Sequence, residues 1–271
     1  MQPRRFGILG FGAIGRSIVA AVAQAPVPGH QLTALLVRPA QLADAQASVP
    51  PGVVATADIS TLLALAPDVI VEAAGHAAVA AHAEQVLRQG AQLLLLSVGA
   101  LADAGLQARL DQAARAGGTA LVLPVGAIAG LDGLLALRQA GLQRVRYTST
   151  KPPRAWLGTP AQQGFDLLAL REATVVFEGT ARQAALAFPK NANLAAAVAL
   201  ASLGLDATTV QLVADPAATG NTGQIDAEGA TSRLRVTVSG ASSAGNPKTS
   251  GIVGFSVLSC LVNAGAAIRF G

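Results

Sequence analysis

Three glycines near the start of the chain, Gly10, Gly12 and Gly15, follow the spacing G-x-G-x-x-G within the stretch LGFGAIGRSI. Between a strand and a helix, the first glycine permits a tight turn, the second lets a pyrophosphate approach the backbone, and the third lets helix and strand pack closely. The free N–H groups of the helix would face the phosphates. The predicted cofactor contacts in this loop are Gly10, Gly12, Ala13, Ile14 and Gly15. The alternative is a loop that serves packing only, because the chain holds 29 glycines.

The end of the second predicted strand indicates which nicotinamide cofactor the loop would bind. A carboxylate at this point holds the ribose 2′-hydroxyl of NAD, whereas an arginine can accommodate the 2′-phosphate of NADP. The stretch here is LLVRP, with Arg38 at the expected place and no carboxylate before Asp44. We therefore expect Arg38 to contact the cofactor and favour NADP, with NAD left open. The alternative is that Arg38 is a solvated loop residue.

The only three lysines each lie beside proline, in TKPP (Lys151), FPKN (Lys190) and NPKTS (Lys248). Lysines at such turns suit carboxylate binding or proton transfer. Lys151 and Lys190 are the preferred pocket residues, and Lys248 is expected to cap the last helix or hold a domain contact. His76 follows the apolar run DVIVEAAG, at the sheet edge where ligands collect in this architecture. Each has a structural alternative: surface charge or a loop anchor for the lysines, a structural hydrogen bond for His76.

The order of elements places the glycine loop in an α/β fold. Apolar strands are predicted at Phe6–Leu9, Gln31–Val37, Asp68–Glu72, Gln92–Ser97 and Thr119–Leu123. Helices are predicted at Ala13–Ala25, Ala77–Arg88 and Leu101–Ala116. Strands that are apolar throughout and alternate with helices are typical of a parallel sheet covered on both faces. Residues 1–124 are thus expected to form a Rossmann-type, doubly wound dinucleotide-binding domain.

The pattern changes after this point to that of a smaller α+β domain for substrate binding and dimerisation, over residues 125–245. Helices are predicted at Ala129–Gln139 and on both sides of Pro189, and strands at Arg144–Thr150, 173–180, Val210–Ala214 and Arg233–Ser239. Residues 246–271 are expected to form a helix that returns to the first domain. Their segment Thr249–Ile268 carries no charge and is long enough to span a bilayer, but its serines and glycines favour a buried helix.

Composition narrows the class of protein further. The chain of 271 residues has a formal net charge of +4 without a basic run, and aromatic residues make up only 3%. That argues against a base-stacking surface for nucleic acid. A single cysteine, Cys260, excludes an intrachain disulfide, and no signal-peptide pattern opens the chain. No cluster has metal-ligand spacing. We expect a cytoplasmic enzyme with a small-molecule substrate, no nucleic acid or membrane partner, and no metal.

Several longer stretches share one family resemblance. They are GFGAIGR (10–16), VEAAGHAAV (71–79), LSVGALAD (96–103), LPVGAIAGLDGL (123–134), TKPPRAW (150–156), FEGTARQAALAFPKNANLAAAVALA (177–201), ADPAATGN (214–221) and NPKTS (246–250). In this order they resemble the L-aspartate dehydrogenase family along nearly the whole chain.

The resemblance implies a two-domain NAD(P)-dependent homodimer that interconverts L-aspartate with iminoaspartate, and thus with oxaloacetate and ammonia. In the family, the alanine after the VG pair and the second asparagine of FPKNxN contact the cofactor. These positions correspond to Ala127 and Asn193. The structural alternative for Asn193 is a helix cap after Pro189.

One departure from the family bears on the chemistry. The family's acid/base histidine lies two residues after the asparagine of ADPxxxxN, and here that asparagine is Asn221 and the histidine position is Gly223. No histidine follows His82. Asn221 and Gly223 are expected to line the substrate pocket, and a smaller residue at 223 would leave room for a bulkier substrate. The remaining candidates for proton transfer are His76, Lys151 and Lys190.

Two other functions stay open at this point. One is a protein that lacks the histidine and binds cofactor without turnover, as a sensor or a partner subunit. The same two-domain plan also serves reductases that act on other imines. In all three cases the hydride chemistry belongs to the cofactor, and the protein supplies orientation, charge and a proton donor.

Overall fold

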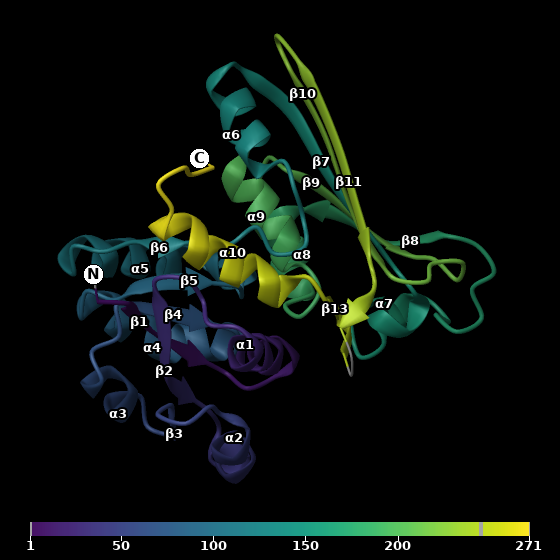
Figure 1. Cartoon of the computed structure of the whole chain (residues 1–271). Helices are drawn as coiled ribbons and strands as arrows, with labels where there is room; N and C mark the ends of the chain where they lie inside the picture. The colour runs from purple at the N-terminus through teal and green to yellow at the C-terminus, as the bar shows by residue number, and fades with distance from the viewer. Residues whose placement is uncertain (1, 244–245, 271) are drawn as a thin grey trace. The chain divides into compact units, whose positions relative to one another are not determined.

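The computed structural model describes residues 2–243 and 246–270 and divides the chain into two compact units (Figure 1). One unit runs to Pro124 and includes the segment from Gly254 onward; the other is Val125–Val253. The segment after Gly254 therefore joins the first unit.

The first unit is built on a six-stranded parallel sheet with the strand order β3-β2-β1-β4-β5-β6. The strands are β1 (Arg4–Leu9), β2 (His30–Leu36), β3 (Val54–Thr56), β4 (Val69–Glu72), β5 (Gln92–Leu95) and β6 (Leu121–Val122). The helices are α1 (Ala13–Gln24), α2 (Leu42–Ser48), α3 (Ile59–Ala64), α4 (His76–Arg88), α5 (Ala104–Ala116) and α10 (Val253–Gly265). This is the doubly wound Rossmann-type sheet expected from the sequence.

The central strands owe their place to their apolar side chains. Ile8, Leu35, Ile70 and Leu93 have no exposed surface, as strands buried on both faces require. The order reverses at β1, from which the chain moves first toward β3 and then toward β6. Such a reversal is the point at which open α/β sheets bind ligands, beyond the carboxyl ends of the strands.

Some helices at this edge of the sheet begin with a side-chain N-cap and others do not. Asp58 caps α3 and Asp103 caps α5 by accepting hydrogen bonds from the first-turn backbone N–H groups. By contrast, Gly12 before α1 and Gly75 before α4 provide no side-chain cap. These two helices directly follow β1 and β4, so their N–H groups remain available at the ligand edge.

The second unit has a five-stranded sheet of order β11-β10-β7-β9-β8, in which β7 and β9 are parallel and the other pairs antiparallel. Its strands are β7 (Leu142–Lys151), β8 (Thr174–Thr180), β9 (Thr209–Ala214), β10 (Asn221–Gly229) and β11 (Arg233–Gly240), with β12 (Ser242–Ser243) and β13 (Asn246–Ser250) forming a separate pair. The helices are α6 (Leu131–Gln139), α7 (Ala161–Gly164), α8 (Ala181–Ala187) and α9 (Asn193–Ala201).

Buried and more exposed side chains alternate along β7 and β10, so this sheet has one buried face and one exposed face. Val145, Tyr147 and Ser149 are buried on one face, while Arg144 and Arg146 are exposed on the other. Since side chains alternate along a strand, the buried face is the one that α6, α8 and α9 cover (Figure 1).

Three expectations about elements were incomplete. The strand β10 was not predicted, because Asn221–Gly229 carries polar residues and glycines rather than an apolar run. Val210–Ala214 and Arg233–Ser239, which alternate like antiparallel strands, are not neighbours in the sheet: β9 pairs parallel with β7 and antiparallel with β8. The helix α10 is shorter than the uncharged segment and only partly buried, with Phe255 57% exposed. In the described part of the chain, no helix is long and apolar enough to cross a membrane.

Candidate functional site

The glycine loop has the geometry that its sequence spacing requires. Gly10 has a φ of +106°, and a Cβ there would lie 2.8 Å from the backbone of Ala73 and Ala74. A Cβ at Gly15 would collide with the carbonyl oxygen of Gly10. A Cβ at Gly12 would meet nothing within 4 Å. Hence Gly10 and Gly15 hold β1, β4 and α1 close together, while the open space beside Gly12 suits a phosphate.

A cavity of about 550 Å³ lies along this loop in the first unit. It is lined by Leu9, Gly10, Phe11, Gly12, Leu36, Val37, Arg38, Pro39, Gln41, Ala57, Ala73, Ala74, Ala77, Ala78, Ala81 and His82. This lining contains no carboxylate. Its volume falls within the range of small-molecule and cofactor sites. The residues present therefore fit a dinucleotide, and they would hold its pyrophosphate at Gly12 and the start of α1.

Arg38 lies at the rim of this cavity. It is exposed, and its Nε donates to Oε1 of Gln41 at 3.1 Å. The amide nitrogen of Gln41 in turn donates to the carbonyl oxygen of Phe11 at 3.3 Å. Gln41 thus ties Arg38 to the glycine loop, a role that sequence reasoning missed. His82 also lines the cavity, and the sequence analysis did not single it out.

A buried carboxylate holds the turn that contributes Ala73 and Ala74 to the cavity lining. Glu72, at the end of β4, has no exposed surface. One of its oxygens accepts hydrogen bonds from the backbone N–H groups of Ala74 and Gly75 at 2.8 Å each, and from the Ser97 hydroxyl at 3.0 Å. The other accepts from the Ser97 backbone N–H at 2.9 Å. The carboxylate therefore fixes the turn between β4 and α4, and the sequence analysis did not single it out.

His76 is the first residue of α4 and is half-buried. The prediction placed it at the carboxyl edge of the sheet, and it does follow β4 there. It is absent from the lining of the cavity, although Ala77 and Ala78 beside it are present. The structure thus separates His76 from the pocket along the glycine loop.

In the second unit, polar residues gather at the ends of β7 and β10 on the face that is otherwise apolar. Lys151 ends β7 and is only 7% exposed, and its Nζ lies 5.8 Å from the centroid of the Trp156 ring. Thr222 pairs with Thr150, so Asn221 at the start of β10 lies level with Lys151. Asn221 is also 7% exposed. The structure therefore brings together two residues that are 70 positions apart in the sequence.

Asn191 joins this corner from the turn between α8 and α9. Its Nδ2 donates to the carbonyl oxygen of Ala155 at 3.0 Å, in the 3₁₀ turn Pro153–Trp156 that follows β7. It is 7% exposed. Its neighbour Lys190, the predicted pocket residue, is exposed instead. Sequence reasoning chose the charged residue of FPKN and missed the amide that the fold buries.

Ala127 and Asn193 occupy neighbouring segments of the same unit. Ala127 is buried in the loop before α6, and a Cβ on the preceding Gly126 would lie 3.0 Å from Leu194 Cδ2 in α9. Asn193 is the first residue of α9, whose N-cap is Ala192. The structural alternative for Asn193, an N-cap, is therefore wrong. The side chain of Lys248 lies outside the described residues.

Gly223 does not lie beside open space. It is the third residue of β10, opposite Ser149, and a Cβ on it would lie 2.9 Å from the Tyr147 hydroxyl oxygen and 3.1 Å from Ile128 Cδ1. Tyr147 pairs with Ile225, two residues along, so its ring crosses diagonally over the glycine. The expectation that glycine leaves room here for a bulkier substrate is wrong, because Tyr147 and Ile128 fill that volume.

The phenol of Tyr147 is held neutral by its surroundings. Burial raises its pKa, and a hydrogen bond with the Ser149 side chain opposes that shift only in part. A buried phenol is harder to ionise because the interior solvates the phenolate poorly. The group that covers Gly223 is therefore an uncharged hydroxyl.

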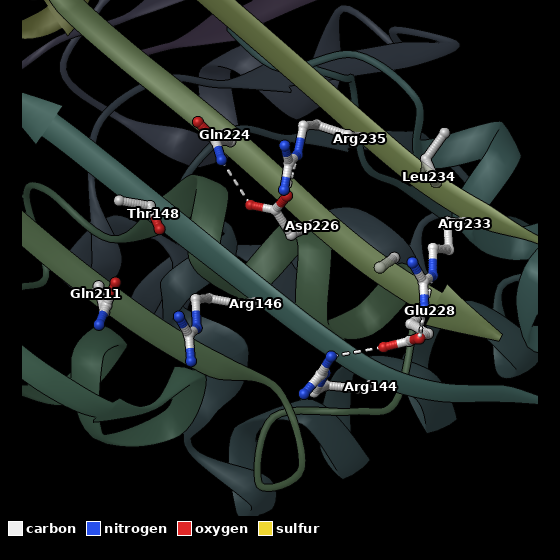
Figure 2. A pocket seen from close by; sticks show the side chains of 11 residues that line it. Arg144, Arg146, Thr148, Gln211, Gln224, Asp226, Glu228, Arg233, Leu234 and Arg235 are labelled. Carbon is white, nitrogen blue, oxygen red and sulfur yellow. Dashed lines mark hydrogen bonds and ion pairs between the residues drawn. The ribbon is translucent and has the colours of Figure 1, made fainter.

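The opposite face of the same sheet forms a shallow, polar concavity of about 790 Å³. Figure 2 shows Arg144 and Arg233 on Glu228, and Arg235 and Gln224 on Asp226. Burial favours the neutral form of Asp226, but hydrogen bonds from Gln224 and Arg235 hold its pKa below the usual range. Hydrogen bonds from Arg233 and Arg144 lower the pKa of Glu228. Arg146 lies among them with no ion pair in the described structure.

Comparisons with known proteins place these features in a family. A model described as "Aspartate dehydrogenase, C-terminal" matches residues 132–264, and one described as "Homoserine dehydrogenase, NAD binding domain" matches residues 10–124. The L-aspartate dehydrogenase of Cupriavidus necator is 44% identical over 270 residues, covering 96% of this chain and 97% of the relative. That of Ruegeria pomeroyi is 45% identical over 265 residues, covering 98% and 94%.

The fold agrees with these matches. The crystal structure of aspartate dehydrogenase from Thermotoga maritima superposes with a TM-score of 0.75 at 25% identity, covering 99% of both chains. A hyperthermophilic archaeal homoserine dehydrogenase, solved with NADPH, shares the fold with a TM-score of 0.57 at 11% identity. With relatives aligned end to end and a glycine loop built for a dinucleotide, the chain belongs to the L-aspartate dehydrogenase family and is an NAD(P)-dependent oxidoreductase.

Proposed function

We propose that the chain interconverts L-aspartate and iminoaspartate, which water converts to oxaloacetate and ammonium. In the oxidative direction the substrate loses a hydride from Cα and a proton from nitrogen, and a C=N bond forms. When bound, a nicotinamide cofactor accepts that hydride. The proposal is carried by one observation beyond the family: the buried lysine and asparagine pair, Lys151 and Asn221, at the ends of two strands.

Lys151 is the residue proposed to hold a substrate carboxylate. Its ammonium group is buried next to Trp156, where a counter-charge interacts more strongly than in water. Asn221 lies level with it on the next strand. Ala127 and Asn193 are proposed to hold the nicotinamide end of the cofactor. A proton route through Lys151, Lys190 or His76 is proposed in place of the histidine that the family resemblance implies at position 223.

The cofactor preference is proposed to be NADP. The support is the cavity along the glycine loop, whose lining has Arg38 and His82 but no carboxylate. A ribose 2′-hydroxyl would find no acidic acceptor there, whereas a 2′-phosphate would meet the guanidinium of Arg38. The cytoplasmic location expected from the sequence stays a prediction, supported by the single cysteine.

A homodimer is proposed to form through the arginine-rich outer face of the five-stranded sheet. The support is the composition of that face, where arginines and carboxylates alternate over β7, β10 and β11. A two-fold axis would place such a surface against itself with opposite charges in reach. Light scattering on the wild type and on Arg235→Glu tests this. We expect a dimer that dissociates in the variant; a monomeric wild type contradicts it.

The test of the activity is the loss of reduced-nicotinamide absorbance with oxaloacetate and excess ammonium, using NADPH and NADH. We expect turnover that requires ammonium and is faster with NADPH. In Lys151→Met, kcat/KM should fall by about 10²–10⁴-fold, and Arg171→Met, at an exposed cation of the same unit, serves as the control. Tight cofactor binding without any turnover would instead support a cofactor-binding protein that has lost the reaction.

A further inference from the structure

Two carboxamide oxygens in the second unit are buried without any hydrogen-bond partner in the described structure. They are Oδ1 of Asn191 and Oδ1 of Asn221. Leaving a buried acceptor unpaired costs about 1–3 kcal/mol, so folded proteins rarely keep such atoms. Two in the same corner indicate that something absent from the chain completes them.

The orientation of Asn191 is fixed by its neighbour. Carboxamide oxygen and nitrogen are normally assigned from their partners. Here the partner is the carbonyl oxygen of Ala155, which can only accept, so the group 3.0 Å from it must be the Nδ2 donor. The unpaired atom of Asn191 is therefore an acceptor. For Asn221 the partner is the Ser250 hydroxyl at 3.5 Å, which can donate or accept, so Asn191 carries the argument.

Both asparagines lie against the same short segment. Asn191 is bonded to the turn Pro153–Trp156, and Asn221 is level with Lys151, the last residue of β7 before that turn. The corner thus combines one ammonium group with two unpaired acceptors. An α-amino acid has the complementary groups, since its carboxylates accept and its protonated nitrogen donates three hydrogen bonds.

We propose that the carboxamide oxygens of Asn191 and Asn221 accept hydrogen bonds from the substrate nitrogen, and so make the site selective for amino and imino acids over keto and hydroxy acids. The inference rests on the proposed function and adds to it the groups that recognise nitrogen. A keto acid offers no donor and would leave both acceptors unpaired, and a hydroxy acid offers one. Rejection of a ligand that lacks a required donor is the stronger form of specificity.

The test compares L-aspartate with succinate, which has the same two carboxylates and no nitrogen. Each is titrated calorimetrically into enzyme saturated with NADPH, a complex in which aspartate cannot react. The readout is the ratio of the dissociation constant of succinate to that of aspartate. We expect at least a tenfold preference for aspartate in the wild type, and a loss of about 10- to 100-fold in that ratio in Asn191→Leu, since hydrogen bonds to charged groups are worth about 1.5–3 kcal/mol.

The matched control is Trp156→Phe. It removes the bond from the indole N–H to the Val213 carbonyl oxygen, which anchors the same turn, but keeps both asparagines. It should weaken both ligands alike and leave the ratio unchanged. Asn221→Leu is a second variant with the same expected loss if Asn191→Leu does not fold.

An unchanged ratio in a folded asparagine variant overturns the proposal, as does a ratio near one in the wild type. Turnover of oxaloacetate and ammonium by the same wild-type preparation distinguishes a failure of the proposed function from a failure of the proposed nitrogen recognition. If turnover is present while the ratio does not respond to either variant, the proposed function stands and the recognition of nitrogen by these asparagines is wrong. If the wild type neither turns over nor binds aspartate, both are wrong.

Discussion

The hydroxyl oxygen of Tyr147 lies 2.9 Å from the point at which a Cβ on Gly223 would begin. The two residues are diagonal neighbours on β7 and β10, and the ring of Tyr147 uses the space that the glycine leaves. An aromatic ring packed over a strand glycine replaces the contacts that the missing side chain would make. A side chain at position 223 therefore requires a smaller or displaced side chain at position 147.

Gly223→Ala should destabilise the protein by about 1–3 kcal/mol, the usual cost of overpacking a core. The double variant Gly223→Ala/Tyr147→Phe lacks the oxygen nearest to the new methyl group. Its loss of unfolding free energy should be smaller than the sum of the losses of the two single variants by at least ~0.5 kcal/mol. Urea denaturation measures both. The control is Gly240→Ala at the end of β11, where a Cβ meets nothing within 4 Å. Strict additivity would show that the two residues are independent.

Added imidazole should not raise the activity of the wild type. Rescue requires a hole of the right size, and the volume beside Gly223 is occupied by Tyr147 and Ile128. Steady-state rates at increasing imidazole, with a matched series of triazole, are the measurement. A saturable increase with imidazole would mean that Tyr147 moves aside in solution.

Tyr147 provides its own optical signal, because it is the only tyrosine in the chain. Burial raises its pKa well above the usual value of a tyrosine, 10.0. Absorbance at 295 nm should therefore stay flat in the native protein through pH 10, whereas the urea-unfolded chain titrates there. A native titration near pH 10 would contradict the buried position.

The same shift predicts how stability depends on pH. A group whose pKa is raised on folding binds its proton more tightly in the native state. Its contribution is fully present below pH 10 and is lost as the pH rises above 10, where the unfolded chain ionises first. Urea denaturation from pH 8 to 11 should show this decline, and Tyr147→Phe should show less of it.

Arg38→Ala should raise the KM for NADPH by about tenfold or more and leave the KM for NADH within about threefold. The loss corresponds to one charge-assisted hydrogen bond, about 1.5–3 kcal/mol. Arg4→Ala, at the start of β1, is the control for a general change in charge. Equal effects on both cofactors would show that Arg38 does not contact a 2′-phosphate.

Glu72→Gln should destabilise the protein by about 1–3 kcal/mol and weaken cofactor binding. The carboxylate accepts from three backbone N–H groups and one hydroxyl, and the amide of glutamine would present a donor to one of them. Thermal denaturation and cofactor titration are the measurements. Glu84→Gln, whose ion pairs are on the surface, should change stability by under about 1 kcal/mol. Equal effects from the two variants would contradict this role for Glu72.

The sequence by itself determined the Rossmann-type sheet and the glycine loop. Both follow from local rules: apolar runs form buried strands, and Gly10, Gly12 and Gly15 each meet a steric requirement within a few residues of chain. The family followed from motifs in a fixed order, and the comparisons confirm it.

Only the tertiary structure decided which polar residues meet in the second unit. The polar strand β10 gives no apolar signal, so its pairing with β7, which sets Asn221 beside Lys151 and Tyr147 over Gly223, was not predictable from local pattern. Burial decided between the neighbours Lys190 and Asn191, because the turn after α8 exposes one side chain and bonds the other to Ala155. Cross-strand register and burial depend on contacts distant in the chain, which a residue's own neighbours do not specify.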